Sequence, residues 1–222
     1  MDYKYKTTFD CPISICKISE ASLISEASLS NLAPLVPKDI DYKSNVDLLG
    51  VAFNAAVVNK FNRNGDGMDT ETAIAYTPNF VHKPTNIEHD KEKVVGHIVD
   101  AGFSSFDTSE VLSAEEVKNK NTPFNIALGA VIYKSVNKNF TNLVESSLDP
   151  ESSSYKKVSA SWEIGFSDYV LAVGSDELKD AKIISDPEKI QEMKGFLRSY
   201  GGTGKTDKGE SIYRLIKGQI YT

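Results

Sequence analysis

Residues 157–166 read KVSASWEIGF, and this segment indicates most clearly which kind of secondary structure forms the fold. Apolar and polar residues alternate along it, which is typical of a strand with one covered and one accessible face. In such a strand Ser159, Ser161 and Glu163 share one face, while the residues between them point the other way. Two hydroxyls and a carboxylate on one face indicate either a solvent-facing surface or a nucleophile with a nearby acid.

Comparable segments elsewhere predict the other strands. They cover residues 48–58, 94–103, 125–136 and 211–221, while residues 170–173 continue the strand at 157–166. Short helices separate some of these strands without alternating with them regularly, which argues against a doubly wound sheet. We therefore expect an α+β fold with a mostly antiparallel β-barrel or sheet core and surrounding helices.

The clearest helix is predicted over residues 186–199. Asp186 has the side chain of an N-cap, Pro187 suits the first turn, and Glu188 lies near the positive end of the helix dipole. The glycine pair at residues 201–202 is expected to end this helix.

The composition is that of an ordinary globular protein. The chain has 222 residues, a net charge of −6, 40% apolar residues and two cysteines. A chain of this length buries about 70% of its unfolded surface, so we expect one domain over residues 1–222 that needs no disulfide or metal. Nucleic acid and membrane are not expected as partners, because no basic stripe is present and an acidic chain is not attracted to anionic lipid.

The beginning of the chain is polar. Residues 1–10 lack the apolar core of a signal peptide, and no apolar run in the chain reaches the roughly 20 residues of a membrane span. We therefore expect a cytoplasmic protein in which Cys11 and Cys16 are reduced thiols.

Two loops imitate ligand-binding motifs. Residues 62–67 (NRNGDG) resemble a calcium loop, but its twelfth position is Ala73 instead of a bidentate carboxylate. Residues 201–206 (GGTGKT) resemble a phosphate loop, but Ser199 occupies the place of the required first glycine. Both segments are therefore expected to be turns, and no cofactor is predicted.

The histidines are His82, His89 and His97, and none has a cysteine pair at zinc-ligand spacing. A metal site is therefore not predicted. His89 is the best candidate for a catalytic base, because it lies between two acidic residues just ahead of a strand. An imidazole held by a loop at such a place could meet a distant nucleophile.

Three sequence blocks occur in an order that resembles a known family. They are the Asn-x-Asn-Gly-Asp turn at 62–66, the Asn-x-x-His block at 86–89 with the strand at 94–98, and the Ser-x-Glu strand at 161–163 with Phe166, Asp168 and Tyr169. Together they resemble the prohead (head maturation) proteases of tailed bacteriophages, which are serine proteases of the herpesvirus assemblin-like fold. The resemblance covers residues 48–173 and implies a herpesvirus-protease-like architecture.

The resemblance implies roles for individual residues. It makes His89 the general base and Ser161 the nucleophile, since a serine needs an imidazole within hydrogen-bond reach. Ser159 is a rival nucleophile, because it lies two residues away on the same face. This chain also departs from many relatives, which have serine directly before Ile-Gly-Phe, where this chain has Glu163. The third member, which would orient the imidazole, stays open among three carboxylates: Asp66, Glu163 and, after them, Asp100.

The resemblance also implies a function. It indicates a serine endopeptidase that cleaves scaffold or core proteins and the major capsid protein precursor during phage head maturation, inside the assembling prohead in the host cytoplasm. Self-association is expected. Some members cut after Glu in a pattern of Ile or Leu, any residue, Glu and a small residue. The tandem repeat ISEASL at 18–29 contains this pattern at Glu20 and Glu26. We therefore expect residues 1–30 to be a mobile, self-processed N-terminal segment.

Two other functions remain alternatives. A non-enzymatic prohead core or scaffold protein could retain the protease fold, and its Ser161 and His89 would then lie far apart. A barrel that binds a small ligand would instead contain a closed apolar cavity.

Overall fold

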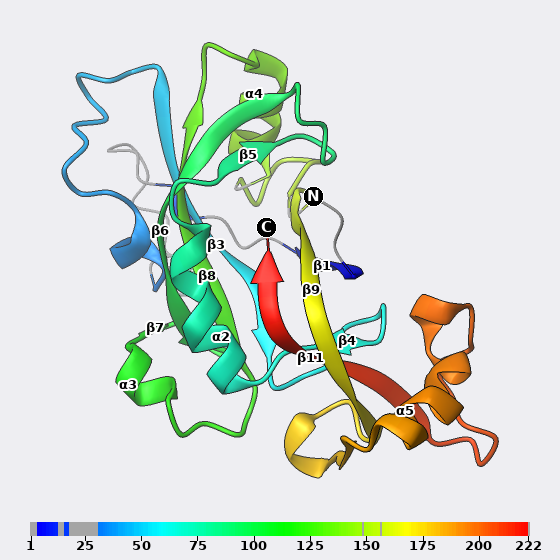
Figure 1. The fold of residues 1–222 in the computed structure, drawn as a ribbon. Helices are drawn as coiled ribbons and strands as arrows, with labels where there is room; N and C mark the ends of the chain where they lie inside the picture. The colour runs from blue at the N-terminus through cyan, green and yellow to red at the C-terminus, as the bar shows by residue number, and fades with distance from the viewer. Residues whose placement is uncertain (1–3, 13–15, 18–30, 148, 156, 222) are drawn as a thin grey trace.

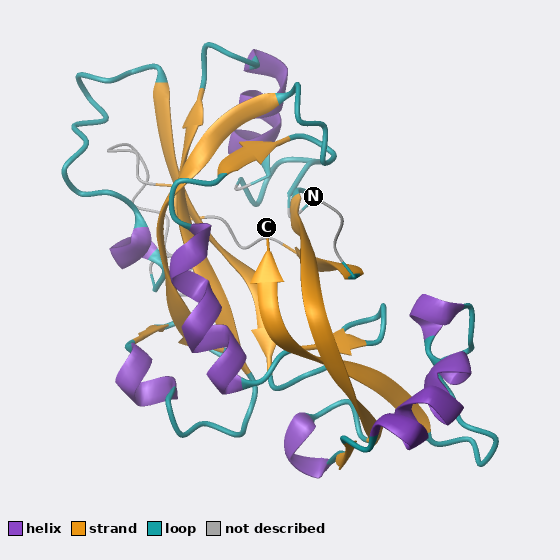
Figure 2. Ribbon diagram, viewed as in Figure 1, coloured by secondary structure: helices purple, strands orange, loops and turns teal. Residues whose placement is uncertain are grey.

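The computed structural model describes residues 4–12, 16–17, 31–147, 149–155 and 157–221 (Figure 1). The chain is a mixed α+β structure in which curled, mostly antiparallel sheets form a half-barrel. Figure 2 shows the strands at the centre and the helices around them. The expected α+β class with a mostly antiparallel core is therefore confirmed.

The first sheet holds the serine-rich strand. Its order is β1 (Tyr5–Pro12), β9 (Ser159–Gly174), β11 (Ser211–Tyr221) and β4 (Asp66–Gly67), with β10 (Lys182–Ile184) also paired to β9. All of these pairs are antiparallel except β11 with β4. The strands expected at 157–166 and 170–173 are one continuous strand of 16 residues, β9. The strand expected at 211–221 is confirmed as β11.

The second sheet carries the histidine hairpin. Its order is β2 (Cys16–Lys17), β3 (Leu48–Val58), β8 (Phe124–Tyr133), β6 (Val94–Ser105) and β5 (Pro84–Asn86), with β7 (Val111–Leu112) paired to β6. The strand expected at 48–58 is confirmed as β3. The other two differ at their ends, since β6 continues to Ser105 and β8 ends at Tyr133.

The helices are short. They are α2 (Thr70–Tyr76), α3 (Ala114–Val117), α4 (Lys138–Ser146) and α5 (Pro187–Met193), with 3-10 turns at Ala33–Leu35, Thr77–Phe80, Leu178–Asp180, Lys194–Phe196 and Arg198–Tyr200. The helix expected over 186–199 is therefore too long. Its start is correct, since the Asp186 side chain accepts a hydrogen bond from the Glu188 amide. Gly195 weakens the helix where the chain changes to 3-10 turns, and Gly201 ends the segment with φ +83°.

The main apolar core contains side chains of both sheets, and Trp162 of β9 ties them together. Its ring stacks on Phe9 with 5.0 Å between centroids and meets Phe80 edge-on at 4.7 Å. Its indole Nε1 donates a hydrogen bond to the backbone oxygen of Ala55, at 3.1 Å. Strand β9 is therefore fixed against β3 one residue after Ser161.

A smaller core lies on the opposite face of the second sheet. Leu32, Leu35 and Val36 are buried there against Ala52 of β3 and Ala127 of β8. The segment that carries these three side chains thus covers the face of the sheet that turns away from the main core.

Gly129 of β8 allows this covering segment to approach closely. A Cβ at this position would lie 1.8 Å from the backbone oxygen of Leu35. We expect Gly129→Ala to reduce the free energy of unfolding by about 1–3 kcal/mol, because the segment must move away. Urea unfolding measures this loss. Gly195→Ala is the matched control, since a Cβ there meets nothing within 4 Å. A Gly129→Ala protein with an unchanged midpoint would contradict the close contact.

Candidate active site

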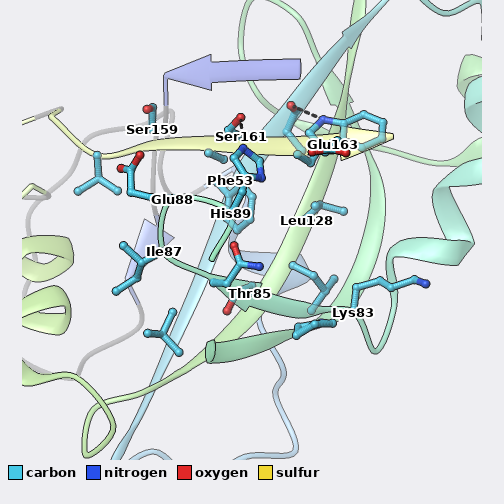
Figure 3. Close-up of a pocket in the computed structure, with 18 of the residues that line it drawn as sticks. Phe53, Lys83, Thr85, Ile87, Glu88, His89, Leu128, Ser159, Ser161 and Glu163 are labelled. Carbon is cyan, nitrogen blue, oxygen red and sulfur yellow. Dashed lines mark hydrogen bonds between the residues drawn. The ribbon is translucent and has the colours of Figure 1, made fainter. Parts of the chain in front are cut away.

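The structure brings two of the expected residues into contact. The imidazole Nε2 of His89 lies 3.0 Å from the hydroxyl oxygen of Ser161, within hydrogen-bond distance (Figure 3). The two residues are 72 positions apart in the chain: Ser161 belongs to β9 of the first sheet, and His89 lies in the loop between β5 and β6 of the second. This distance matches the separation expected between a serine nucleophile and its general base.

The loop between β5 and β6 holds His89. The amide of Ile87 donates to the backbone oxygen of Lys93, and the amide of Asp90 donates to the backbone oxygen of Ile87. The Asp90 carboxylate also pairs with the Lys93 ammonium at 2.7 Å. Hydrogen bonds from Lys93 and from the Glu92 amide hold the pKa of Asp90 below its ordinary value. These interactions join residues before His89 to residues after it and so hold the loop together.

Two successive residues of this loop adopt the left-handed conformation. Glu88 has φ +54° and His89 has φ +58°, although neither is glycine. Such a conformation costs about 1–3 kcal/mol per residue and persists only where the surrounding structure enforces it. Residues of this kind cluster at active sites, where the strain fixes the direction of a side chain.

Ser161 lies on the accessible face of β9. Ser159, Ser161 and Glu163 are all exposed, and each lines the same cavity (Figure 3). The alternation expected from the sequence is therefore present. The hydrogen bond between the His89 ring and a serine involves Ser161, and none joins His89 to Ser159.

The three carboxylates expected to orient His89 have other partners in the structure. Within the described chain, no hydrogen bond joins the imidazole to Asp66, Glu163 or Asp100. Glu163 lines the cavity, but its carboxylate pairs with the Lys6 ammonium at 3.2 Å. Asp100 is exposed and accepts a hydrogen bond from the Ala101 amide.

Asp66 belongs to a buried ion pair. It is 2% exposed, and its Oδ1 accepts a hydrogen bond from Arg214 Nε at 2.6 Å, while its Oδ2 accepts one from the Thr7 hydroxyl. Arg214 is 3% exposed and also donates to the backbone oxygen of Lys6. Both carboxylate oxygens of Asp66 are therefore occupied, and this residue joins β4, β11 and β1 instead of contacting His89.

The turn at residues 62–66 strengthens the same junction. The side-chain amides of Asn62 and Asn64 both donate to the backbone oxygen of Thr8 in β1. Asn62 Oδ1 in turn accepts the amide of Asp66. The segment that resembles a calcium loop thus holds β1 in place through side-chain hydrogen bonds. The described residues contain no group of three His, Cys, Asp or Glu side chains placed to hold a metal.

The hydrogen bonds of the other two histidines are made to residues other than Ser161. His97 Nδ1 lies 2.8 Å from the Tyr133 hydroxyl, across the strands β6 and β8. His82 has φ +71°, and its amide donates to the backbone oxygen of Ile98. Cys11, Cys16 and the glutamates of the ISEASL tandem have no described side chains. No helix in the described ranges is long and apolar enough to cross a bilayer.

A cavity of about 620 Å³ extends from the Ser161–His89 pair into the half-barrel. One wall is apolar and includes Val51, Leu128, Ile132, Phe140 and Leu143. Lysines also line it, from four separate segments: Lys6, Lys83, Lys91 and Lys157. Sequence reasoning did not identify these lining residues. The only signal for them is the apolar spacing of Phe140, Leu143 and Val144 in α4.

The chain was compared with protein-family models, with curated proteins and with solved structures, and none of the three comparisons gave a match.

Proposed function

We propose that this protein is a serine endopeptidase in which Ser161 is the nucleophile and His89 the general base. The observation that carries the proposal is the 3.0 Å separation of Ser161 Oγ and His89 Nε2. The left-handed backbone at His89 and the cavity beside the pair add support, because an endopeptidase needs a fixed base and room for a peptide.

The proposed chemistry is acyl transfer. His89 takes the hydroxyl proton of Ser161 as the oxygen attacks the scissile carbonyl carbon, and the imidazolium then gives that proton to the leaving amine. A water molecule attacks the resulting ester, His89 takes a proton from it, and the peptide acid leaves as the Ser161 hydroxyl is restored. No metal or nucleotide takes part.

We further propose a herpesvirus-protease-like fold and a role as a phage prohead protease. The order of the three sequence blocks supports this, together with the curled antiparallel half-barrel and the pairing of the serine and histidine. Its substrates would be scaffold or core proteins and the major capsid protein precursor. It would act in the host cytoplasm inside the assembling prohead and would self-associate. A closed shell favours cleavage because it raises the effective concentration of enzyme and substrate.

We propose cleavage after glutamate. Lys83, Lys91 and Lys157 line the cavity and supply positive charge for an acidic substrate side chain. The negative charge of Glu163 is balanced by Lys6. The cavity wall is therefore suited to a carboxylate as well as to apolar groups.

Self-processing is a testable part of this proposal. We expect purified active protein to lose its N-terminal residues through Glu20 or Glu26, because both fit the expected cleavage pattern. Intact mass measures the loss. The Ser161→Ala chain and a Glu20→Gln, Glu26→Gln chain should both keep their full mass. Retention of residues 1–29 by protein that cuts another substrate would disprove self-processing.

The proposal as a whole is tested by co-expression with the neighbouring capsid and scaffold proteins, followed by intact-mass measurement. Site-specific cleavage that requires Ser161 supports it. The alternative is a non-enzymatic prohead core or scaffold protein with the protease fold, which predicts intact partners in every co-expression. The small-ligand barrel is less well supported, because polar side chains of Ser161, His89 and several lysines line the cavity.

A further inference from the structure

The first two strands of the chain belong to different sheets. β1 pairs with β9 along residues 159–166, and β2 pairs with β3 (Figure 1). Both strands precede the ISEASL tandem at 18–29, so a cut after Glu20 or Glu26 leaves them together on one N-terminal piece. Self-processing would therefore cut the covalent link between these two strands and the rest of both sheets.

One face of β1 is buried. Phe9 is 3% exposed, and its ring stacks on Trp162 of β9 with 5.0 Å between centroids. The Tyr5 ring meets the Tyr169 ring edge-on at 4.9 Å. Thr7, which lies between these two aromatic residues, is 7% exposed. Alternate residues of β1 thus point into the protein, as the two-residue period of a strand requires.

Polar contacts hold β1 at the same place. The Thr7 hydroxyl donates a hydrogen bond to Asp66 Oδ2 at 2.5 Å, and the other oxygen of this carboxylate accepts one from Arg214. Arg214 also donates to the backbone oxygen of Lys6 at 3.2 Å. Removal of β1 would leave two buried charged groups each without one of its hydrogen-bond partners, which is unfavourable in a site that water does not reach.

The N-terminal piece also contributes to the cavity. Lys6 of β1 lines it and pairs with Glu163 at 3.2 Å. The backbone of Ser161 lies opposite Asp10 in the pairing of β9 with β1. Removal of the piece would therefore uncover one edge of β9 and take a lysine from the wall of the cavity.

We infer that the N-terminal piece stays bound after self-processing, so that the processed protein is a non-covalent complex of two pieces. This inference rests on the proposed function. The binding surface is the edge of β9 along residues 159–166 together with the edge of β3, and its occupant is this chain's own residues 1–20 or 1–26. Cleavage removes the tether and the effective concentration that it supplies, so retention depends on the contacts of the piece itself. Backbone pairing provides the affinity of an added strand, and buried side chains provide its specificity.

The test uses the full Ser161→Ala chain, which under the proposed function cannot cut itself. The recognition sequence of an unrelated, sequence-specific protease is placed between Glu26 and Ala27, and that protease is added. Mass measured on denatured protein shows the cut, whether or not the piece stays bound. Native mass and gel filtration then show whether the pieces remain together. We expect one complex that contains both, and elution of the larger piece without the smaller one would overturn the inference.

Phe9→Ala tests whether the contacts of β1 retain the piece. Trp162 fluorescence first confirms that the uncut variant is folded. After the cut, we expect the N-terminal piece to bind about 100-fold more weakly, because a buried aromatic side chain is lost. Phe9→Leu keeps an apolar side chain without the stacked ring, so its effect should be smaller, and it also serves where Phe9→Ala does not fold.

Lys6→Met is the matched control. It removes only the exposed ion pair with Glu163 and keeps the backbone oxygen that Arg214 contacts. We expect it to weaken binding by no more than about fivefold. If the Phe9 variants and Lys6→Met released the piece equally, packing of β1 would not retain it and the inference would be wrong.

The outcomes separate this inference from the proposed function. If the wild-type chain cuts itself and its partners but the two pieces separate, the retained strand is wrong and the endopeptidase stands. If the pieces of the Ser161→Ala chain stay together but the wild-type chain cuts neither itself nor the co-expressed proteins, the binding surface for β1 stands and the endopeptidase is wrong. If the pieces separate and nothing is cut, both are wrong.

Discussion

Ser161→Ala is expected to reduce cleavage of co-expressed scaffold and capsid precursor proteins by about 10⁴-fold or more. In the proposed mechanism the acyl-enzyme forms on the hydroxyl that lies 3.0 Å from His89 Nε2, and alanine has no oxygen to acylate. Intact mass of the partner proteins, taken over time, measures the loss. His89→Gln should reduce cleavage comparably, because the serine and its base act as one unit.

Ser159→Ala is the matched control. Ser159 lies two residues away on the same exposed face of β9 and lines the same cavity, but it has no hydrogen bond to His89. We expect this variant to keep most of the activity. If Ser159→Ala stops cleavage while Ser161→Ala does not, Ser159 is the nucleophile and the assignment of the serine is off by two residues. If no chain ever cuts, the non-enzymatic core protein is favoured.

Arg214→Met is expected to lower the free energy of unfolding by about 3–5 kcal/mol, because it leaves the Asp66 carboxylate buried without its cation. The two groups are 3% and 2% exposed, so water cannot replace the lost partner. The guanidinium carbon of Arg214 also lies 5.0 Å from the centre of the Phe166 ring, a contact that methionine preserves only in part. Urea unfolding monitored by Trp162 fluorescence measures the change.

Two controls make this prediction specific. Lys6→Met removes the exposed ion pair with Glu163 and should cost no more than about 1 kcal/mol. The double variant Asp66→Leu, Arg214→Met removes both buried charges and should be more stable than Arg214→Met alone. If Arg214→Met unfolded at the wild-type urea concentration, the pair would not stabilise the junction of β1, β4 and β11.

Local patterns predict the strands well and the site only in part. The alternation around Ser161 correctly places three polar side chains on one face, because the two-residue period depends on neighbouring residues alone. The end of α5 is less predictable, since Gly195 and the following 3-10 turns replace a regular helix. The meeting of His89 with Ser161 follows from no local pattern. It depends on how two sheets curl together, and only the order of the sequence blocks indicates it.

Asp66 shows why the third site residue is harder to predict. Its sequence context marks it as a special turn residue, which suggests a catalytic role as easily as a structural one. Its partner Arg214 is 148 residues away, and sequence spacing gives no sign of that ion pair. The lysines of the cavity come from β1, from both sides of β5 and from the segment before β9, so no local sequence pattern groups them.

The position of β9 between β1 and β11 also determines when the first sheet can be completed during synthesis. β1 is made first and β11 last, yet both must pair with β9, and Arg214 must reach Asp66 to complete the junction. Contacts of such long sequence separation form slowly, because a large loop has to close before they can be made. A ribosome that has just translated β9 therefore carries a nascent chain in which β1 is present but β11, the strand on the other side of β9, is not yet made. The sheet around β9 is therefore complete only after the residues of β11 have been synthesised, and under the proposed function a chain without β11 is expected to be a poor protease.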